Sequence, residues 1–169
     1  MTATTVMAPI DQRYYEDYPT GAVFEGGPIH VDEAEVLAFA HRYDPQPFHV
    51  DAAAAARSMY GGIIASGWHT AAMTMRVLVE SYLSSVASLG SPGIDELRWT
   101  LPVRPGDTLY VRITVIEARR SRSKPDRGIV RTLIETRNQR EEQVLSMKAM
   151  NFMLCRDLVP AVSADGPNE

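Results

Sequence analysis

Cysteine and basic charge are both scarce in this sequence. Among 169 residues there is one cysteine, Cys155, so an intramolecular disulfide is impossible, and no cluster of cysteine and histidine has the spacing of a zinc site. The formal net charge is −4, whereas nucleic-acid-binding domains usually carry a clear basic excess. These shortages exclude a disulfide scaffold and argue against a metal site and against a nucleic-acid partner.

A long hydrophobic run is also missing. The most apolar stretch, residues 68–83, is interrupted by Arg76 and Glu80, and it is too short and too charged to span a bilayer. Residues 1–9 lack the basic start and the apolar segment of a secretory signal. We therefore expect a cytoplasmic protein with no membrane partner.

What the sequence does contain is the composition of one folded domain. Hydrophobic residues make up 45% of the chain and charged residues 22%, which is typical of globular proteins and sufficient for a core. We expect a loose arm over residues 1–12, a single domain over residues 13–158, and a frayed tail over residues 159–169.

Three helices are predicted, and the third is the most informative. Asp32 is suited to be the N-cap of the first helix, which Pro45 and Pro47 end, and Asp51 is suited to cap a second helix over residues 52–57. Residues 67–83 are apolar nearly all round, apart from one narrow polar stripe. A helix of this kind is buried on most sides, so the rest of the chain is expected to wrap around it.

Alternation of apolar and polar residues predicts strands, mostly in the second half of the chain. A period of two is the signature of a half-buried strand. It covers residues 108–118 and 128–138 and, less regularly, residues 144–154. Residues 23–31 and 95–100 are expected to add two short strands. One buried helix wrapped by a curved antiparallel sheet is an α+β fold.

A proline-stiffened loop between the first two helices carries two proton-transfer groups. It reads Tyr43-Asp44-Pro45-Gln46-Pro47-Phe48-His49, with one carboxylate and one imidazole that can both exchange protons near neutral pH. A water held between Asp44 and His49 could be deprotonated there, and Tyr43 and Phe48 could supply an apolar wall. The alternative is structural, because an Asp after a helix is often a cap and a lone His often only packs.

Ser66 and Gly67 stand where the long helix is expected to begin. The first backbone N–H groups of a helix have no internal partner and lie at the positive end of its dipole. A glycine at this point lets a ligand carbonyl approach closely, so its N–H could polarise that carbonyl as an oxyanion hole does. The alternative is a plain serine N-cap followed by a glycine that is needed for packing.

Residues 119–127 form a basic hairpin tip in an acidic protein. Arg122 and Lys124 at this tip could attract the phosphate groups of a ligand. The alternative is a solvated loop that keeps the end of a strand soluble.

These segments, in this order, resemble the MaoC-like acyl dehydratases, a family that includes the (R)-specific enoyl-CoA hydratases. The family pattern has an Asp, a short Asn-Pro-containing loop and a His five positions after the Asp, which here are Asp44 and His49. The resemblance extends from about Tyr18 to Leu154. It also rests on Gly61-Gly62-Ile63-Ile64-Ala65-Ser66-Gly67 and on Pro102-Val103-Arg104-Pro105-Gly106-Asp107-Thr108-Leu109. Gln46 departs from the pattern, because these enzymes usually have Asn there.

The resemblance implies a hotdog fold, in which a curved antiparallel sheet wraps one long central helix, and a homodimer or a dimer of dimers. It implies that Asp44 and His49 hold the water and share the proton transfers of a syn addition, and that the N–H of Gly67 holds the thioester oxygen. The substrate would be an acyl thioester of coenzyme A or of a carrier protein, with no separate cofactor. The expected substrate contacts are Ser66, Tyr43, Phe48, Trp68, Arg122 and Lys124.

The activity implied is that of a hydro-lyase, which adds water reversibly to the α,β double bond of an enoyl thioester to give an (R)-3-hydroxyacyl thioester. Two alternatives stay open. A thioesterase uses the same fold, but its catalytic carboxylate generally lies on or beside the central helix, where this chain offers Glu80, well past the helix start. A non-catalytic acyl-thioester-binding protein would be indicated if Asp44 and His49 pointed away from any cavity.

Overall fold

The computed structural model describes residues 8–158. The predicted tail, residues 159–169, and the first seven residues of the predicted arm lie outside this range. Within the rest of the arm, the backbone carbonyl of Ile10 accepts a hydrogen bond of 3.0 Å from the backbone N–H of Ser85. Among the described residues, no helix has the length and apolar character needed to cross a membrane.

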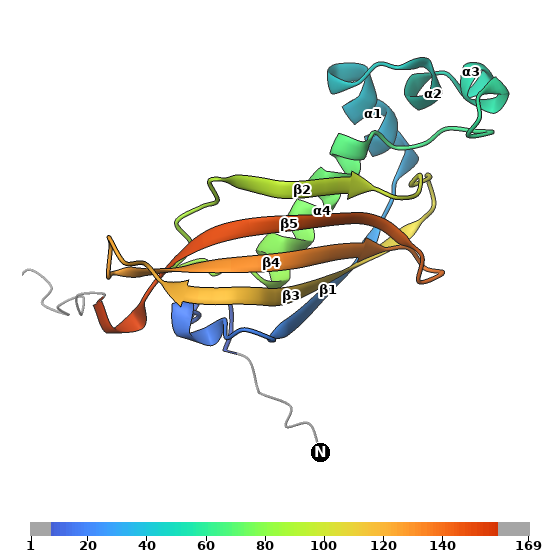
Figure 1. The fold of residues 1–169 in the computed structure, drawn as a ribbon. Coiled ribbons are helices and arrows are strands. Elements are labelled where there is room, and N and C mark those ends of the chain that lie inside the picture. Colours follow the sequence, from blue (N-terminus) through green and yellow to red (C-terminus); the bar gives the residue numbers. More distant parts are fainter. Residues whose placement is uncertain (1–7, 159–169) are drawn as a thin grey trace, which may run out of the picture.

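Five strands form one antiparallel sheet in the order β1-β3-β4-β5-β2 (Figure 1). All five expected strands are present, with ends that differ from the predicted ones by a few residues. They are β1 (Val23–His30), β2 (Gly93–Trp99), β3 (Thr108–Arg120), β4 (Arg127–Arg137) and β5 (Gln143–Leu154).

The alternation in β4 shows why these residues form a sheet with one covered face. Val130 and Ile134 are buried on its inner side, whereas Arg131 and Glu135 stand on the outer side and are partly exposed. Successive side chains of a strand point to opposite faces, so a period-two pattern separates a core face from a solvent face.

The central helix α4 (Gly67–Ser81) lies along the inner face of the curved sheet (Figure 1). It packs closely on β1, where a Cβ on Gly26 would collide with the side chains of Val77 and Ser81. A sheet wrapped in this way around one long helix is the predicted hotdog fold. The largest fully buried side chains of its core include Tyr18, Tyr82, Leu109, Ile113, Ile134, Leu145 and Met153.

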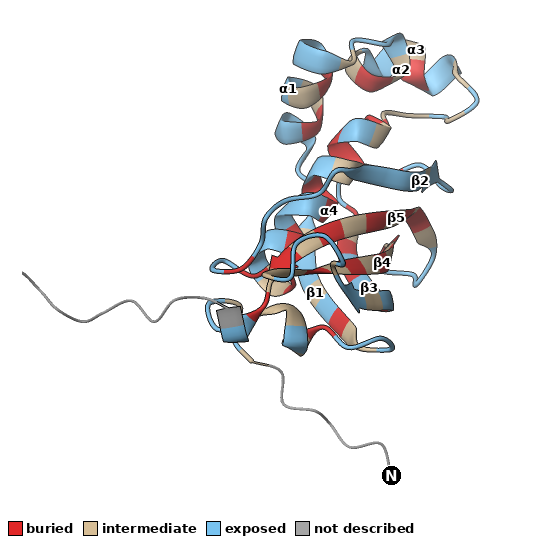
Figure 2. Cartoon of the chain, turned by 60° about the vertical axis from the view of Figure 1, so that its left-hand side comes forward, coloured by how far each residue is buried: buried red, intermediate tan, exposed pale blue. Residues whose placement is uncertain are grey.

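One face of α4 stays uncovered within the single chain, which corrects the prediction that this helix is buried on most sides. Met73, Val77 and Leu78 are buried beneath the sheet, but Trp68 is 61% exposed and Val79 is 51% exposed. Figure 2 shows exposed segments along α4 and along β2. A single sheet covers one side of a helix, and hydrophobicity alone does not tell whether the other side is covered by the same chain.

Three short helices lie together beyond one end of the sheet (Figures 1 and 2). They are α1 (Glu33–Tyr43), α2 (Pro47–Val50) and α3 (Ala52–Arg57), and single 3₁₀ turns occur at Tyr15–Asp17 and Arg156–Leu158. The side chain of Asp32 caps α1 and that of Asp51 caps α3, as predicted. Helix α2 was expected to be loop. Pro47 is its first residue, where the missing proline N–H costs no hydrogen bond.

The hairpin between β3 and β4 lies at the other end of the sheet from these three helices (Figure 1). The strand register agrees with this view. Arg120 pairs with Gly128 beside the hairpin, whereas Val111 pairs with Thr136 near the end where β2 finishes at Trp99. The two ends of the sheet therefore carry different parts of the predicted site.

Candidate active site

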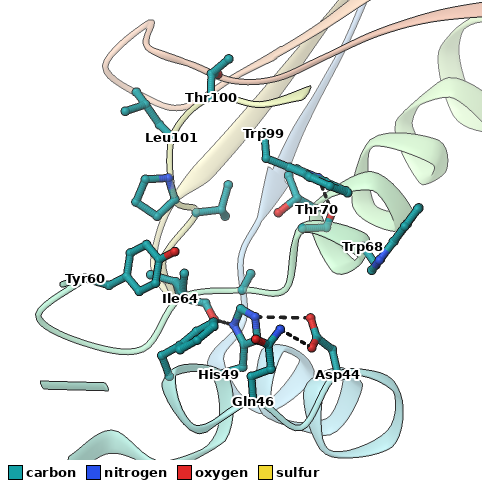
Figure 3. A pocket seen from close by; sticks show the side chains of 15 residues that line it. Asp44, Gln46, His49, Tyr60, Ile64, Trp68, Thr70, Trp99, Thr100 and Leu101 are labelled. Carbon is teal, nitrogen blue, oxygen red and sulfur yellow. Dashed lines mark hydrogen bonds and ion pairs between the residues drawn. The ribbon is translucent and has the colours of Figure 1, made fainter. Parts of the chain in front are cut away.

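A pocket of about 450 Å³ opens where α2, the start of α4 and the end of β2 meet (Figure 3). It contains both predicted proton-transfer groups and the predicted oxyanion glycine. Its lining also contains aromatic and aliphatic side chains from the loops before α4 and after β2. The lining residues are Asp44, Gln46, Phe48, His49, Tyr60, Ile64, Ala65, Gly67, Trp68, Thr70, Trp99, Thr100, Leu101, Pro102 and Val103.

Asp44 follows the last residue of α1 and is fixed by two side-chain donors. The Ser66 hydroxyl donates to its Oδ2 at 2.7 Å, and the Gln46 amide donates to its Oδ1 at 2.7 Å. A carboxylate accepts through both oxygens, so these bonds set its orientation and leave lone pairs that face the pocket.

His49 sits on the single turn of α2 and is 4% exposed. Its Nδ1 lies 2.7 Å from the backbone carbonyl oxygen of Ile64. A carbonyl only accepts hydrogen bonds, so Nδ1 must carry the proton. In the neutral ring the lone pair is then on Nε2, which lies 3.3 Å from Oδ2 of Asp44.

The two facing atoms, Nε2 of neutral His49 and Oδ2 of Asp44, are both acceptors. They repel each other unless a proton or a water lies between them or beside them. A water that donates one O–H to each atom satisfies both, and it turns its own lone pairs towards the pocket. The arrangement can therefore hold and activate one water.

Hydrogen bonding keeps Asp44 ionised. Burial acts to raise the pKa of its carboxyl, but the hydrogen bonds from Ser66 and Gln46 outweigh it, together with the positive charge of His49 when that ring is protonated, and the pKa is lowered below its ordinary value. Hydrogen bonds to the charged form of a carboxyl stabilise that form. Asp44 is thus an acceptor at neutral pH.

Gly67 is the first residue of α4 and lines the same pocket. Its N–H has no acceptor inside the helix, because the first four N–H groups of a helix have none. The preceding residue, Ser66, is the N-cap, and its hydroxyl accepts from the N–H of Trp68 at 3.2 Å. The Gly67 N–H therefore remains available to a ligand oxygen at the positive end of the helix dipole.

The ring of Trp99, the last residue of β2, lies close against this glycine. A Cβ on Gly67 would lie only 2.6–2.8 Å from three atoms of the indole ring. The indole N–H donates to the carbonyl oxygen of Gly67 at 2.8 Å. Close contact with Trp99 is thus a physical reason for glycine at position 67.

The structure brings together some of the predicted substrate contacts and not others. Phe48 and Trp68 line the pocket. Ser66 is fully buried and does not line it, so its hydroxyl orients Asp44 instead of meeting a ligand. Tyr43 is 63% exposed and packs on Phe39 outside the pocket. Neither Ser66 nor Tyr43 therefore lines the pocket of this single chain.

Arg122 and Lys124 are also outside the pocket. They lie in the β3–β4 hairpin, at the end of the sheet away from Asp44 and His49 (Figure 1). Within the described range of residues 8–158, neither side chain forms a salt bridge, and no group of three or more His, Cys, Asp or Glu could hold a metal ion.

Gln46, Tyr60 and Trp99 also line the pocket, in addition to the predicted substrate contacts. Gln46 departs from the family pattern, yet its longer side chain reaches the Asp44 carboxylate. Tyr60 packs on Phe48 at 5.3 Å between ring centroids. The alternation of β2 contained a signal for Trp99, since Leu97 and Trp99 share the face that points towards α4.

The sequence profile of the "MaoC like domain" family matches residues 18–138. Among solved structures, the MaoC-like dehydratase from Rhodospirillum rubrum is 44% identical to this chain, with a TM-score of 0.80, and the match covers 85% of this chain and 98% of that one.

Two further proteins extend the comparison. The R-hydratase PhaJ1 from Pseudomonas aeruginosa is 27% identical, with a TM-score of 0.65 over 83% of this chain and 84% of that chain. The protein YdeM of Bacillus subtilis is 29% identical over 129 residues, which are 76% of this chain and 90% of YdeM.

Proposed function

Because this chain belongs to the MaoC-like domain family, which includes hydratases and dehydratases, we propose that it is a hydro-lyase acting on an acyl thioester. It adds water reversibly to the α,β double bond of a trans-2-enoyl thioester and yields an (R)-3-hydroxyacyl thioester. The observation that carries the proposal is the placement of Asp44, His49 and the Gly67 N–H around one pocket.

In the hydration direction the thioester oxygen accepts a hydrogen bond from the Gly67 N–H. The water held by Asp44 and His49 loses a proton to the pair as its oxygen bonds to the β carbon. Electrons move to the thioester oxygen, where the N–H and the helix dipole stabilise the developing charge. The pair then returns a proton to the α carbon, and the double bond has gained the elements of water.

Both new bonds form on one face of the substrate. Nε2 of His49 and Oδ2 of Asp44 are 3.3 Å apart, so they approach a planar enoyl group from the same side. The water oxygen and the returned proton are consequently delivered in a syn addition.

The position of the carboxylates favours the hydratase over the thioesterase. The acidic residue of α4, Glu80, lies in its last turn and is bonded to Arg76 at 2.6 Å on the surface. The carboxylate of the pocket is Asp44, which stands with its imidazole before the helix. Asp44 and His49 both line the cavity. This placement also favours a catalyst over a protein that only binds thioesters.

The protein acts as a homodimer paired through β2. This strand is at one edge of the sheet, and all of its residues except Leu97 are exposed. An open edge presents unpaired N–H and C=O groups that a second strand can join. Trp68 and Val79 on the uncovered face of α4 and Ile94 of β2 are exposed apolar side chains in the single chain, and a partner would cover them.

Two-fold pairing through β2 would also bring the basic β3–β4 hairpin of one protomer close to the pocket of the other. In such a dimer β2 would pair antiparallel with β2 of the second copy, and the two-fold axis would pass through the middle of this pair. Each end of one protomer's sheet then lies beside the opposite end of the other protomer's sheet. The partner subunit's hairpin then comes to the pocket end of this protomer. The partner's Arg122 and the partner's Lys124 would receive the phosphates of coenzyme A, which is part of the substrate and not a separate cofactor. The cytoplasmic location stays a prediction.

The proposal is tested with purified protein and crotonyl-CoA. Loss of the enoyl-thioester absorbance without release of free thiol is the expected result. Release of free thiol would identify a thioesterase. Absence of both reactions with short, long and branched enoyl-CoA and carrier-protein substrates, while saturated acyl-CoA still binds, would favour the non-catalytic alternative.

A further inference from the structure

The indole of Trp99 is part of the pocket wall and is held against Gly67, although Trp99 is 44% exposed in the single chain. Two contacts with Gly67 hold it: its N–H donates a hydrogen bond to the Gly67 carbonyl, and its five-membered ring lies close to the Gly67 backbone. Its second neighbour is Trp68, whose ring lies edge-on at 5.3 Å between centroids. The two tryptophans together form one side of the pocket (Figure 3).

This wall stands directly beside the group that is proposed to hold the thioester oxygen. The ring contacts the residue whose N–H is the oxyanion donor, so the acyl carbons nearest the thioester must pass next to it. A side chain that is held by a hydrogen bond and by backbone contact cannot swing aside without breaking both. Size limits in apolar pockets come from such fixed walls.

We infer that Trp99 determines acyl specificity, by restricting the pocket to short acyl groups. The inference rests on the proposed function, since it assumes that the pocket holds an acyl thioester. The ligand class is a short-chain acyl-CoA. Longer chains are rejected by contact with the indole and not by any loss of the Asp44–His49 pair.

Removal of the indole opens the wall and leaves the catalytic pair in place. Trp99→Ala deletes the ring beside Gly67, so additional acyl methylenes become buried in the space that the ring occupied. Each buried methylene strengthens binding by about fourfold. Trp99→Phe keeps an aromatic ring but loses the N–H that anchors it, so its effect should be intermediate.

The experiment measures binding of butyryl-CoA and octanoyl-CoA by calorimetry to the full-length protein and its variants. These saturated ligands do not react, so the result does not depend on catalysis. The matched control is Ile94→Ala, which removes another large exposed apolar side chain from β2 but does not line the pocket. It reports any general effect of weakening this edge strand.

The wild type and Ile94→Ala should bind butyryl-CoA more tightly than octanoyl-CoA. In Trp99→Ala the affinity ratio of octanoyl-CoA to butyryl-CoA should rise by at least about tenfold, and in Trp99→Phe by less. An unchanged ratio in both Trp99 variants would overturn the inference even if the wild type hydrates crotonyl-CoA. Equal changes in Ile94→Ala, or tight octanoyl-CoA binding by the wild type, would also overturn it. Failure of hydration with an intact shift in the ratio would instead reject only the proposed reaction.

Discussion

The two ends of α4 are built from different kinds of contact. At its C-terminal end the rings of Tyr18, Phe24 and Tyr82 pack with centroids 5.1–5.5 Å apart, and all three are buried. Arg13 closes this end by donating to the carbonyl of Ser81 at 2.8 Å. At its N-terminal end the helix opens into a pocket. The same helix is therefore anchored by packing at one end and offers unpaired groups at the other.

The ionisable groups at the two ends respond to burial in different ways. Burial raises the pKa of the Tyr18 hydroxyl to about 12 and so keeps it neutral. Burial also acts to raise the pKa of Asp44, but the bonds from Ser66 and Gln46 reverse the direction and keep that carboxyl charged. A buried charge in a folded protein needs donors aimed at it, and at the N-terminal end of α4 Ser66 and Gln46 supply them to Asp44.

The largest effect is expected from the catalytic pair. Asp44→Asn and His49→Ala should each lower kcat/KM for crotonyl-CoA by about 10²–10⁴-fold, because each removes a proton-transfer group. Thermal unfolding should change little in comparison. Turnover at the wild-type rate in both variants would contradict the mechanism.

A substitution at the C-terminal end of α4 should lower stability and leave activity nearly unchanged. Phe24→Ala leaves a cavity between Tyr18 and Tyr82, and we expect it to lower the free energy of unfolding by about 3–5 kcal/mol. At a temperature where the variant is still folded, kcat/KM should stay near that of the wild type. Denaturant melts and initial rates on the same samples separate the two effects.

Gly67→Ala tests the closeness of Trp99 to the oxyanion donor. The added methyl group would meet the indole ring, so either the ring or the helix start must shift. A misplacement of about 1 Å beside reacting atoms can cost about 10²-fold in rate. Gly93→Ala is the matched control, since nothing lies within 4 Å of its added Cβ. Equal rates for the two variants would show that the contact at Gly67 is not important for catalysis.

A smaller effect is expected in the pH dependence of Ser66→Ala. Loss of the Ser66 hydrogen bond should raise the pKa of Asp44, so kcat/KM should begin to fall at a higher pH as the solution is acidified. Ser84→Ala is the control at the other end of α4, because Ser84 is also buried and bonds the backbone N–H of Ala87, but does not touch Asp44. Both variants should lose stability, but only Ser66→Ala should shift the acidic limb of the pH profile of kcat/KM.

The smallest effect should come from the hairpin. Arg122→Ala and Lys124→Ala should each raise KM for crotonyl-CoA by about two- to fivefold, which is the range of an exposed ion pair. The N-acetylcysteamine thioester of crotonate has no phosphates and should be unaffected. An equal rise in KM for both substrates would contradict the proposal that these side chains bind the phosphates of coenzyme A.

Local patterns were sufficient to predict the strands, because alternation such as that of Val130 and Ile134 against Arg131 and Glu135 reports directly on which face is covered. They were also sufficient for the caps at Asp32 and Asp51. Contacts between distant segments could not be predicted from local patterns. The bond from Ser66 to Asp44 and that from Trp99 to Gly67 join residues 22 and 32 positions apart, and no periodicity reports them.

The exposed face of α4 shows a different limit. Its apolar residues predicted burial, but a hydrophobic side chain carries no information about whether its cover comes from the same chain. Helix α2 was missed for a third reason. Pro45 and Pro47 together predict a break in helical structure, but a proline at the first position of a helix, as Pro47 is in α2, favours its start.

The most direct test of the central claim is the stereochemistry of water addition. Crotonyl-CoA is hydrated in D₂O, and the relative configuration of the new C–D and C–O bonds is read from proton couplings in the product. Because Asp44 and His49 lie 3.3 Å apart on one side of the pocket, both bonds should form on the same face of the double bond. Addition to opposite faces, or a mixture of the two, would contradict a mechanism in which this pair holds the water and returns the proton.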